Sequence, residues 1–223
     1  MELWIDTIDR KVIERVKELG LLYGVTTNPS ILARVNLPAE EILEDLLNHF
    51  PGPLAVQVTL SSASEIIDQG RDLYDFSPRI IVKIPVTEAG IEAIFRLNHN
   101  QIPTMATAVL TPLHAFLAAK AGARYIAVYF SHLGQQAVER AVSIQHTLKA
   151  NGCNSKLLIA SLKNREQVEQ CIMQGFPAMT LNPDLFRQCL EPSKEMLQTL
   201  DAFEADWSKA SPSNLLTTRQ FIG

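Results

Sequence analysis

One lysine lies within an apolar run of the sequence, where a charged side chain needs an explanation. Lys83 belongs to the segment Arg79–Val86, whose other members are mostly Ile, Val and Pro, as in a strand buried within a parallel sheet. Burial disfavours the ammonium form and lowers a lysine's pKa, which yields a neutral amine able to attack a carbonyl carbon. An edge-strand lysine that blocks aggregation, or one whose amine reaches water, would fit the segment equally well. The run alone therefore allows Schiff-base chemistry without requiring it.

Polar residues also stand at the ends of other short apolar runs. Because residues two apart on a strand share a face, and the active site of a barrel lies at the carboxyl ends of its strands, this spacing predicts a polar layer above an apolar one. Buried polar groups cost stability unless they find partners, so such a layer favours a functional site over core filling. The polar layer is Asp6, Thr26, Gln57, Lys83, Thr107, Tyr129 and Ser161, with Asn28 just beyond; the apolar layer is Trp4, Gly24, Ala55, Ile81, Met105, Ala127 and Ile159.

Several of these polar residues also have structural explanations when taken singly. Asp6 and Asn28 could cap the turn or helix that follows them, and the threonine and serine hydroxyls could satisfy nearby backbone groups. Gln57 and Tyr129 are harder to explain by turn chemistry, and both carry groups that can hold a water beside a lysine. The combination predicts one site around Lys83.

Eight apolar runs, each followed by a helical pattern, must position these residues. Alternating strands and helices of this length imply right-handed crossovers and a parallel sheet, and eight units favour an α/β fold of the (β/α)8 TIM barrel type with an added C-terminal helix. An open doubly wound sheet is the alternative. The predicted strands are Leu3–Asp6, Leu22–Thr26, Leu54–Val58, Ile80–Ile84, Ile102–Thr107, Tyr125–Tyr129, Lys156–Ser161 and Ala178–Leu181; the helices are Asp9–Leu19, Pro38–His49, Ser61–Tyr74, Thr87–Asn98, Thr111–Ala121, Gln135–Ala150, Arg165–Gln174 and Pro183–Cys189.

The length of 223 residues suits a single barrel domain covering residues 1–223. Residues 192–223 form an added segment in which Ser193–Trp207 has helical apolar spacing, and Ser211–Gly223 is polar until its last residues. We expect this extension to cover its own barrel or to reach a neighbouring subunit.

Composition and the absence of targeting segments lead us to expect a soluble protein of the cytoplasm. Apolar residues make up 47% and charged residues 20%, and 20 basic against 24 acidic side chains give a net charge of −4, with no basic block that would bind nucleic acid or a membrane surface. The amino terminus lacks a signal-peptide pattern, and no apolar stretch approaches the roughly 18 residues of a membrane span. Three scattered cysteines and five scattered histidines show no metal-ligand spacing, so we expect no metal site.

Three motifs carry a resemblance to a known family. They are Gly24–Ser30 (GVTTNPS), Ile81–Thr87 (IVKIPVT) and Ala119–Ala123 (AKAGA). With these motifs at matching positions, the chain resembles the small transaldolase family over nearly its whole length. The resemblance implies a cofactor-free reaction in which Lys83 forms a Schiff base with a ketone donor, on sugar or sugar-phosphate substrates. It also implies a homo-oligomer, a decamer of two pentameric rings, in which the C-terminal helix packs on a neighbouring subunit.

Three positions bear on the reaction within that family. Its small transaldolases carry Glu, Asn and Phe where this chain has Gln57, Met105 and Tyr129, whereas its fructose 6-phosphate aldolases carry Gln and Tyr at the first and third. The similarity therefore implies a class I aldolase that cleaves or forms fructose 6-phosphate, or related ketoses, from a dihydroxyacetone-type donor and an aldehyde such as glyceraldehyde 3-phosphate. The alternatives are a transaldolase, which passes a dihydroxyacetone unit between sugar phosphates, and a non-catalytic sugar-binding barrel.

The resemblance also implies roles for individual residues. Tyr129, Gln57 and Thr107 would hold the catalytic water, while Met105 and Ala127 would line the substrate pocket. The donor hydroxyls would be contacted by Asp6, Thr26, Asn28 and Ser161.

One position departs from the family pattern. After the sixth strand the aldolases have an Arg that binds the acceptor's phosphate, and here His132 stands in its place. The resemblance implies two other phosphate contacts, Ser161 and Lys163, and at both positions this chain keeps the same type of residue. A neutral His lacks the permanent charge and the bidentate fork of Arg. We therefore expect weaker phosphate recognition at this position than the resemblance alone implies.

Overall fold

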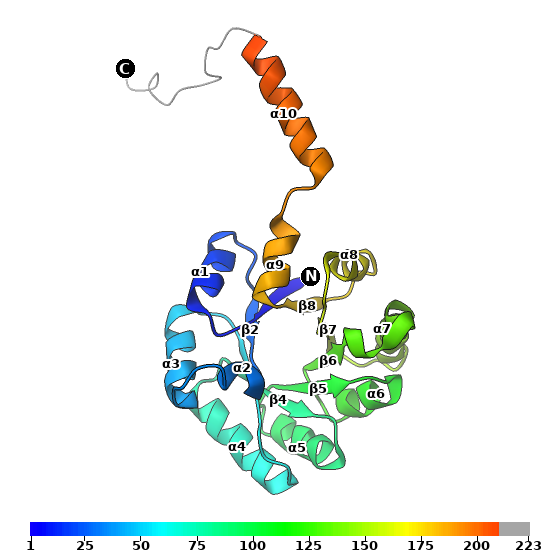
Figure 1. Ribbon diagram of the computed structural model, residues 1–223. Coiled ribbons are helices and arrows are strands. Elements are labelled where there is room, and N and C mark those ends of the chain that lie inside the picture. Colours follow the sequence, from blue (N-terminus) through cyan, green and yellow to red (C-terminus); the bar gives the residue numbers. More distant parts are fainter. Residues whose placement is uncertain (210–223) are drawn as a thin grey trace, which may run out of the picture. The chain divides into compact units, whose positions relative to one another are not determined.

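Eight parallel strands close into a barrel in the computed structural model, which describes residues 1–209 (Figure 1). Each strand pairs with the next one in sequence, and β8 pairs with β1 to close the ring. This confirms the predicted (β/α)8 TIM barrel and excludes the open sheet. The strands are β1 Glu2–Asp6, β2 Gly24–Thr26, β3 Leu54–Gln57, β4 Ile80–Pro85, β5 Thr104–Val109, β6 Tyr125–Tyr129, β7 Lys156–Ala160 and β8 Ala178–Leu181.

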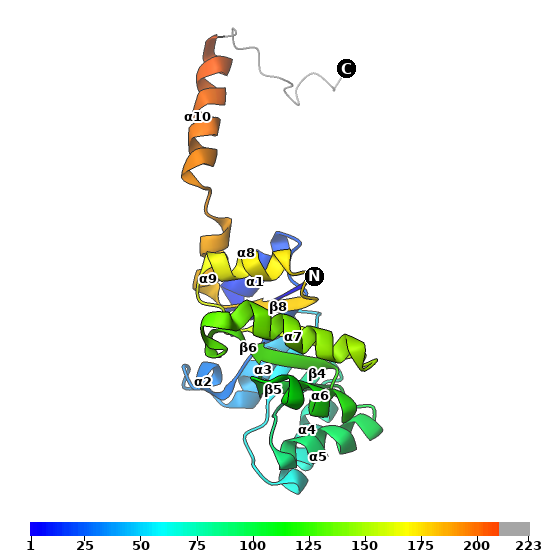
Figure 2. The same cartoon turned by 90° about the vertical axis from the view of Figure 1, so that its right-hand side faces the viewer.

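Most of the helices that connect the strands lie on the outside of the barrel, as the end view and the side view both show (Figures 1 and 2). The helices are α1 Arg10–Glu18, α2 Pro29–Leu32, α3 Ala39–His49, α4 Ala63–Phe76, α5 Glu88–His99, α6 Pro112–Lys120, α7 Ala137–Ala150, α8 Arg165–Met173, α9 Pro183–Leu190 and α10 Lys194–Lys209, with short 3₁₀ turns η1 Phe130–His132 and η2 Gly134–Gln136. Several begin at side-chain caps that the sequence supplies. Ser62 and Glu65 form a capping box at α4, and Thr87, Thr111 and Asn164 cap α5, α6 and α8.

The interior of the barrel below the mouth is apolar. Trp4 and Tyr125 are fully buried there with their rings edge to face, 5.4 Å between centroids. The interior cluster also contains Ala55, Ile81, Met105, Ala127, Leu158 and Ala178. The predicted apolar layer is therefore confirmed at the positions contributed by β1, β3, β4, β5 and β6.

The predicted layer is wrong for β7. Leu158 lies in the interior cluster, and Leu158 and Ala160 line the cavity at the mouth, so the alternate residue Ile159 is not on that face. Ser161 follows the strand with φ 62°, a left-handed backbone conformation that ends the alternation of faces. The inward-facing residues of β7 are therefore Leu158 and Ala160, one residue earlier than the prediction based on Ile159 and Ser161.

The chain divides into two compact units, residues 1–186 and residues 187–223. In the second unit, α10 carries Met196, Leu200, Phe203 and Trp207 at helical spacing, and these apolar side chains are exposed. The predicted segment Ser211–Gly223 lies outside the described residues. Packing of the extension on a neighbouring subunit stays a prediction. None of the helices within residues 1–209 combines the length and the apolar character that crossing a membrane requires.

Candidate active site

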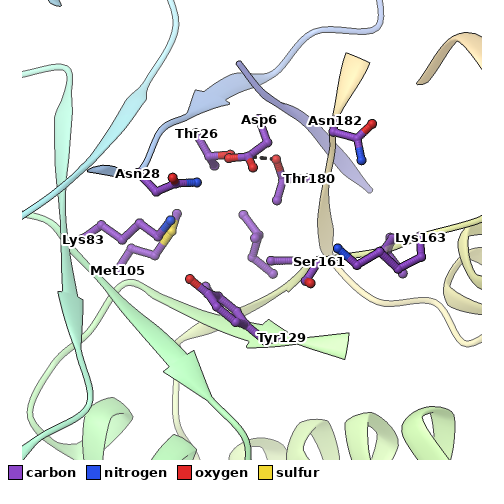
Figure 3. Close-up of a pocket in the computed structure, with 14 residues that line it drawn as sticks. Asp6, Thr26, Asn28, Lys83, Met105, Tyr129, Ser161, Lys163, Thr180 and Asn182 are labelled. Atoms are coloured by element: carbon purple, nitrogen blue, oxygen red, sulfur yellow. Dashed lines mark hydrogen bonds between the residues drawn. The ribbon is translucent and has the colours of Figure 1, made fainter. Parts of the chain in front are cut away.

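The carboxyl ends of the strands surround a small polar cavity of about 180 Å³ (Figure 3). Lys83, Asn28 and Met105 lie on one side of it, and Ser161 and Lys163 lie on the other, with the amine of Lys163 pointing inward. Most of the residues predicted to form the site therefore meet in one place. The lining residues are Asp6, Thr26, Asn28, Lys83, Met105, Ala127, Tyr129, Leu158, Ala160, Ser161, Leu162, Lys163, Thr180 and Asn182.

Lys83 is buried in the middle of the apolar strand β4, with 5% of its surface exposed. Its Nζ donates a hydrogen bond to the main-chain carbonyl oxygen of Thr27, 3.0 Å away, which holds the amine at the mouth of the barrel. Burial lowers the pKa of Lys83, and the negative charge of Asp6 partly opposes that shift. The two structural alternatives of the sequence analysis do not fit: β4 pairs with a strand on each side, and the amine is buried.

Asp6 sits at the end of β1 and belongs to a chain of short hydrogen bonds. The hydroxyl of Thr26 donates to the Asp6 carboxylate at 2.6 Å, and the same hydroxyl oxygen lies 2.8 Å from that of Thr180 on β8. Burial raises the pKa of Asp6, while the hydrogen bond from Thr26 and the charge of Lys83 act against this. Asp6 and Lys83 are thus a buried acid and a buried amine within one cavity.

Tyr129 and Thr107 lie together at the ends of β6 and β5. The Thr107 hydroxyl donates to the phenol oxygen of Tyr129 at 3.3 Å. Gln57 does not line the small cavity; it lines an adjoining cavity of about 460 Å³ together with Tyr129, Asp6 and Asn28. Of the three residues expected to hold a water, Tyr129 thus lines both cavities and Gln57 lines one, while Thr107 lines neither and contacts Tyr129.

Asn28 has both of the roles considered for it. Its side-chain oxygen accepts a hydrogen bond from the Ile31 amide at 3.0 Å and so caps α2, while its side chain lines both cavities. The cap occupies the oxygen, and the amide nitrogen points into the cavity (Figure 3). The structural explanation and the functional one are therefore compatible.

The remaining predicted residues divide into those that line the cavity and one that does not. Met105 and Ala127 are fully buried and form part of the cavity floor. Ser161 faces the cavity, with its hydroxyl 2.8 Å from that of Ser131. His132 is exposed in η1 and lines neither cavity, although its ring lies 5.6 Å from that of Tyr129.

Sequence reasoning missed several residues of the site. Thr180 and Asn182 both line the cavity, and Asn182 also caps α9 through the amide of Leu185 at 2.9 Å. Extending the two-residue repeat from Ala178 through Thr180 to Asn182 would have found both. Ser131, which contacts Ser161, lies in the 3₁₀ turn η1, and Arg34, which lines the adjoining cavity, lies in the loop after α2, so no repeat in the sequence marks them. Among residues 1–209, no three His, Cys, Asp or Glu side chains lie together as metal ligands would.

Comparison with known proteins finds one matching family and bacterial relatives that share a name. A model of the family described as Transaldolase/Fructose-6-phosphate aldolase matches residues 3–217. A protein of Coprothermobacter proteolyticus named "Probable transaldolase" is 31% identical over 212 residues, which are 94% of this chain and 97% of that protein. A protein of Caulobacter vibrioides with the same name is 31% identical over 219 residues, 96% of this chain and all of that protein.

A solved structure is similar in fold alone. A mandelate oxidase mutant with an FMN adduct superposes with a TM-score of 0.55 over 89% of this chain and 70% of that one, at 15% sequence identity. At that identity the similarity concerns only the barrel.

Proposed function

Because this chain belongs to the transaldolase/fructose-6-phosphate aldolase family, we propose that it is a class I aldolase that cleaves fructose 6-phosphate, or a related ketose, through a Schiff base on Lys83. The observation that carries the proposal is the burial of Lys83 in a polar cavity, where desolvation lowers the pKa of its amine. A neutral amine has the lone pair that attacks a ketone, whereas an ammonium does not.

The first step joins the amine to the substrate. The Nζ lone pair of Lys83 attacks the ketone carbon, and the carbinolamine then takes up a proton on its oxygen and loses water to give the imine. Asp6, whose pKa is raised by burial, is placed to exchange that proton. Asn28, Thr26 and Ser161 surround the same cavity and hold the donor hydroxyls in this proposal.

The second step breaks the carbon–carbon bond. Removal of the proton from the hydroxyl at C4 drives cleavage of the C3–C4 bond, which releases the aldehyde and leaves an enamine on Lys83. The enamine then takes a proton at C3, and water hydrolyses the imine to free dihydroxyacetone. The hydrogen-bonded pair of Thr107 and Tyr129, with Gln57 in the cavity that Tyr129 also lines, is suited to hold the water that moves these protons.

A transaldolase is the second candidate, and the names of the two relatives favour it. In that reaction the same enamine attacks a second sugar-phosphate aldehyde instead of taking up a proton. Gln57 and Tyr129 favour the aldolase, because they match that branch of the family pattern. A non-catalytic sugar-binding barrel is less favoured, because binding a sugar does not require a buried lysine with a lowered pKa.

Trapping the imine tests the shared chemistry. Dihydroxyacetone with borohydride should inactivate the enzyme irreversibly and add a reduced donor to Lys83, as peptide mass mapping would show. Lys83→Met should abolish both effects. Modification of Lys120 or Lys163 instead, or no modification, would contradict the proposal.

A second measurement separates the two candidate reactions. Fructose 6-phosphate supplied alone should yield free dihydroxyacetone if the enzyme is an aldolase. Turnover that needs added erythrose 4-phosphate would identify a transaldolase.

A further inference from the structure

We propose that Arg34, which follows β2 and α2, binds the phosphate group of the substrate. This inference rests on the proposed function and names a further residue that recognises its phosphorylated substrate. It adds a phosphate contact after β2 to those that the family pattern places after β6 and β7.

Arg34 lies where a bound sugar would extend from the small cavity. The adjoining cavity of about 460 Å³ shares Asp6, Asn28, Tyr129 and Asn182 with the small one, so the two cavities adjoin at these residues. Among the described residues that line the adjoining cavity, Arg34 alone carries a positive charge. An anionic group in this cavity would therefore meet Arg34 while the reacting carbon stays beside Lys83.

The backbone around Arg34 is fixed against the barrel. Asn28 caps α2, Ile31 is buried with 4% exposed, and the amide of Arg34 donates to the carbonyl oxygen of Ile31 at 3.2 Å. In end view α2 projects over the barrel, and in side view it lies at one end of it (Figures 1 and 2). The side chain of Arg34 thus starts from a defined position at the mouth.

The guanidinium of Arg34 is available for a ligand. No ion pair or side-chain hydrogen bond joins it to any other of residues 1–209. Carboxylates of Asp9, Glu41, Asp45 and Asp184 line a separate cavity of about 750 Å³ that Arg34 also borders, yet none of them pairs with it. A planar fork of donors left free beside the site suits a phosphate, which accepts two parallel hydrogen bonds.

A cation close to Asp6 favours the entry of a phosphate. A phosphate that enters beside a carboxylate is repelled unless a positive charge lies nearby. Lys83, Arg34 and Lys163 are the cations whose charges act on Asp6, in that order. Lys83 is bonded to the substrate during the reaction, so Arg34 and Lys163 are the cations that remain free to contact a phosphate, one from each cavity.

Imine trapping measures phosphate binding without depending on the choice between aldolase and transaldolase. The concentration of ketose that gives half-maximal labelling of Lys83 with borohydride is determined for fructose 6-phosphate and for fructose. We expect Arg34→Gln to reduce the preference for the phosphorylated ketose, as the ratio of the two concentrations, by about tenfold, the lower range for a charge-assisted contact. Arg34→Lys should give an intermediate ratio, because it keeps the charge and loses the fork.

Arg96→Gln is the matched control, because Arg96 is an exposed arginine on the outer helix α5 and its removal changes the net charge equally. It should leave the ratio unchanged. A wild-type ratio in Arg34→Gln, or an equal loss for both ketoses, would overturn the assignment of Arg34 while leaving the Schiff base standing. Absence of labelling in the wild type would instead overturn the proposed function. Thermal unfolding of Arg34→Gln near the wild-type temperature confirms that the variant is folded.

Discussion

The carboxyl of Asp6 and the amine of Lys83 occupy one buried cavity and shift each other's pKa in the direction that favours charge. For Lys83, burial dominates and its pKa is lowered, while Asp6 raises it; for Asp6, burial dominates and its pKa is raised, while Thr26 and Lys83 lower it. The cavity therefore favours the neutral amine of Lys83 and the protonated carboxyl of Asp6 more than water does. This suits an amine nucleophile and an acid that exchanges a proton.

Asp6→Asn should lower the pKa of Lys83 further. The carboxylate stabilises the ammonium, so its removal leaves burial unopposed, and the neutral amine then persists to lower pH. We expect the pH midpoint of imine trapping with dihydroxyacetone to shift toward acid, even though turnover falls because a proton-exchanging group is lost. Rates of trapping between pH 5 and pH 9 would show this. A shift toward alkaline pH, or no shift, would mean that Asp6 does not act on the amine.

Tyr129→Phe should lower cleavage of fructose 6-phosphate by roughly 10²-fold, the scale expected when a positioned proton-transfer group is removed. Imine trapping at Lys83 should persist, because the phenol acts after the imine forms. Thr107→Val tests the hydrogen bond to Tyr129 and should have a smaller effect in the same direction. An unchanged cleavage rate in Tyr129→Phe would remove the phenol from the mechanism.

The sequence predicts much of this fold because the signals of a parallel barrel are local. Each strand is a short buried run and several helices begin at a side-chain cap, so Lys83 and its neighbours at the strand ends can be placed without knowing how the strands meet. Closure of the ring then brings together residues such as Asp6 and Thr180, which are far apart in the sequence. The parts predicted correctly are those that the strand repeat determines.

The errors and omissions lie where that repeat stops. Ser161 has a left-handed backbone just after β7, so the alternation that correctly placed Thr107 and Tyr129 failed there. Arg34 follows a helix of one turn, and its position depends on the burial of Ile31. Irregular segments are set by tertiary contacts that no periodic pattern reports.

Gly24→Ala should destabilise the protein by about 1–3 kcal/mol, the usual cost of overpacking a core. Gly24 pairs in register with Trp4, and a Cβ at this position would overlap the buried indole ring. Denaturant unfolding of the variant gives the cost. In a Trp4→Phe background the smaller ring leaves room, so the added methyl should cost less there. Additive effects of the two substitutions would contradict direct contact between these positions.

His132→Arg should increase the preference for glyceraldehyde 3-phosphate over glyceraldehyde as acceptor. The substitution supplies a permanent charge and a bidentate fork after β6, and a charge-assisted contact of about 1.5–3 kcal/mol corresponds to roughly 10- to 150-fold in affinity. The ring of His132 lies beside that of Tyr129, so a longer arginine side chain at this position can reach the mouth. The ratio of kcat/KM for the two aldehydes measures the effect, with His146→Arg on the outer helix α7 as a control of equal charge. A ratio that His132→Arg leaves at the wild-type value would show that position 132 does not contact the phosphate, and that the cations at the other sides of the mouth provide its recognition alone.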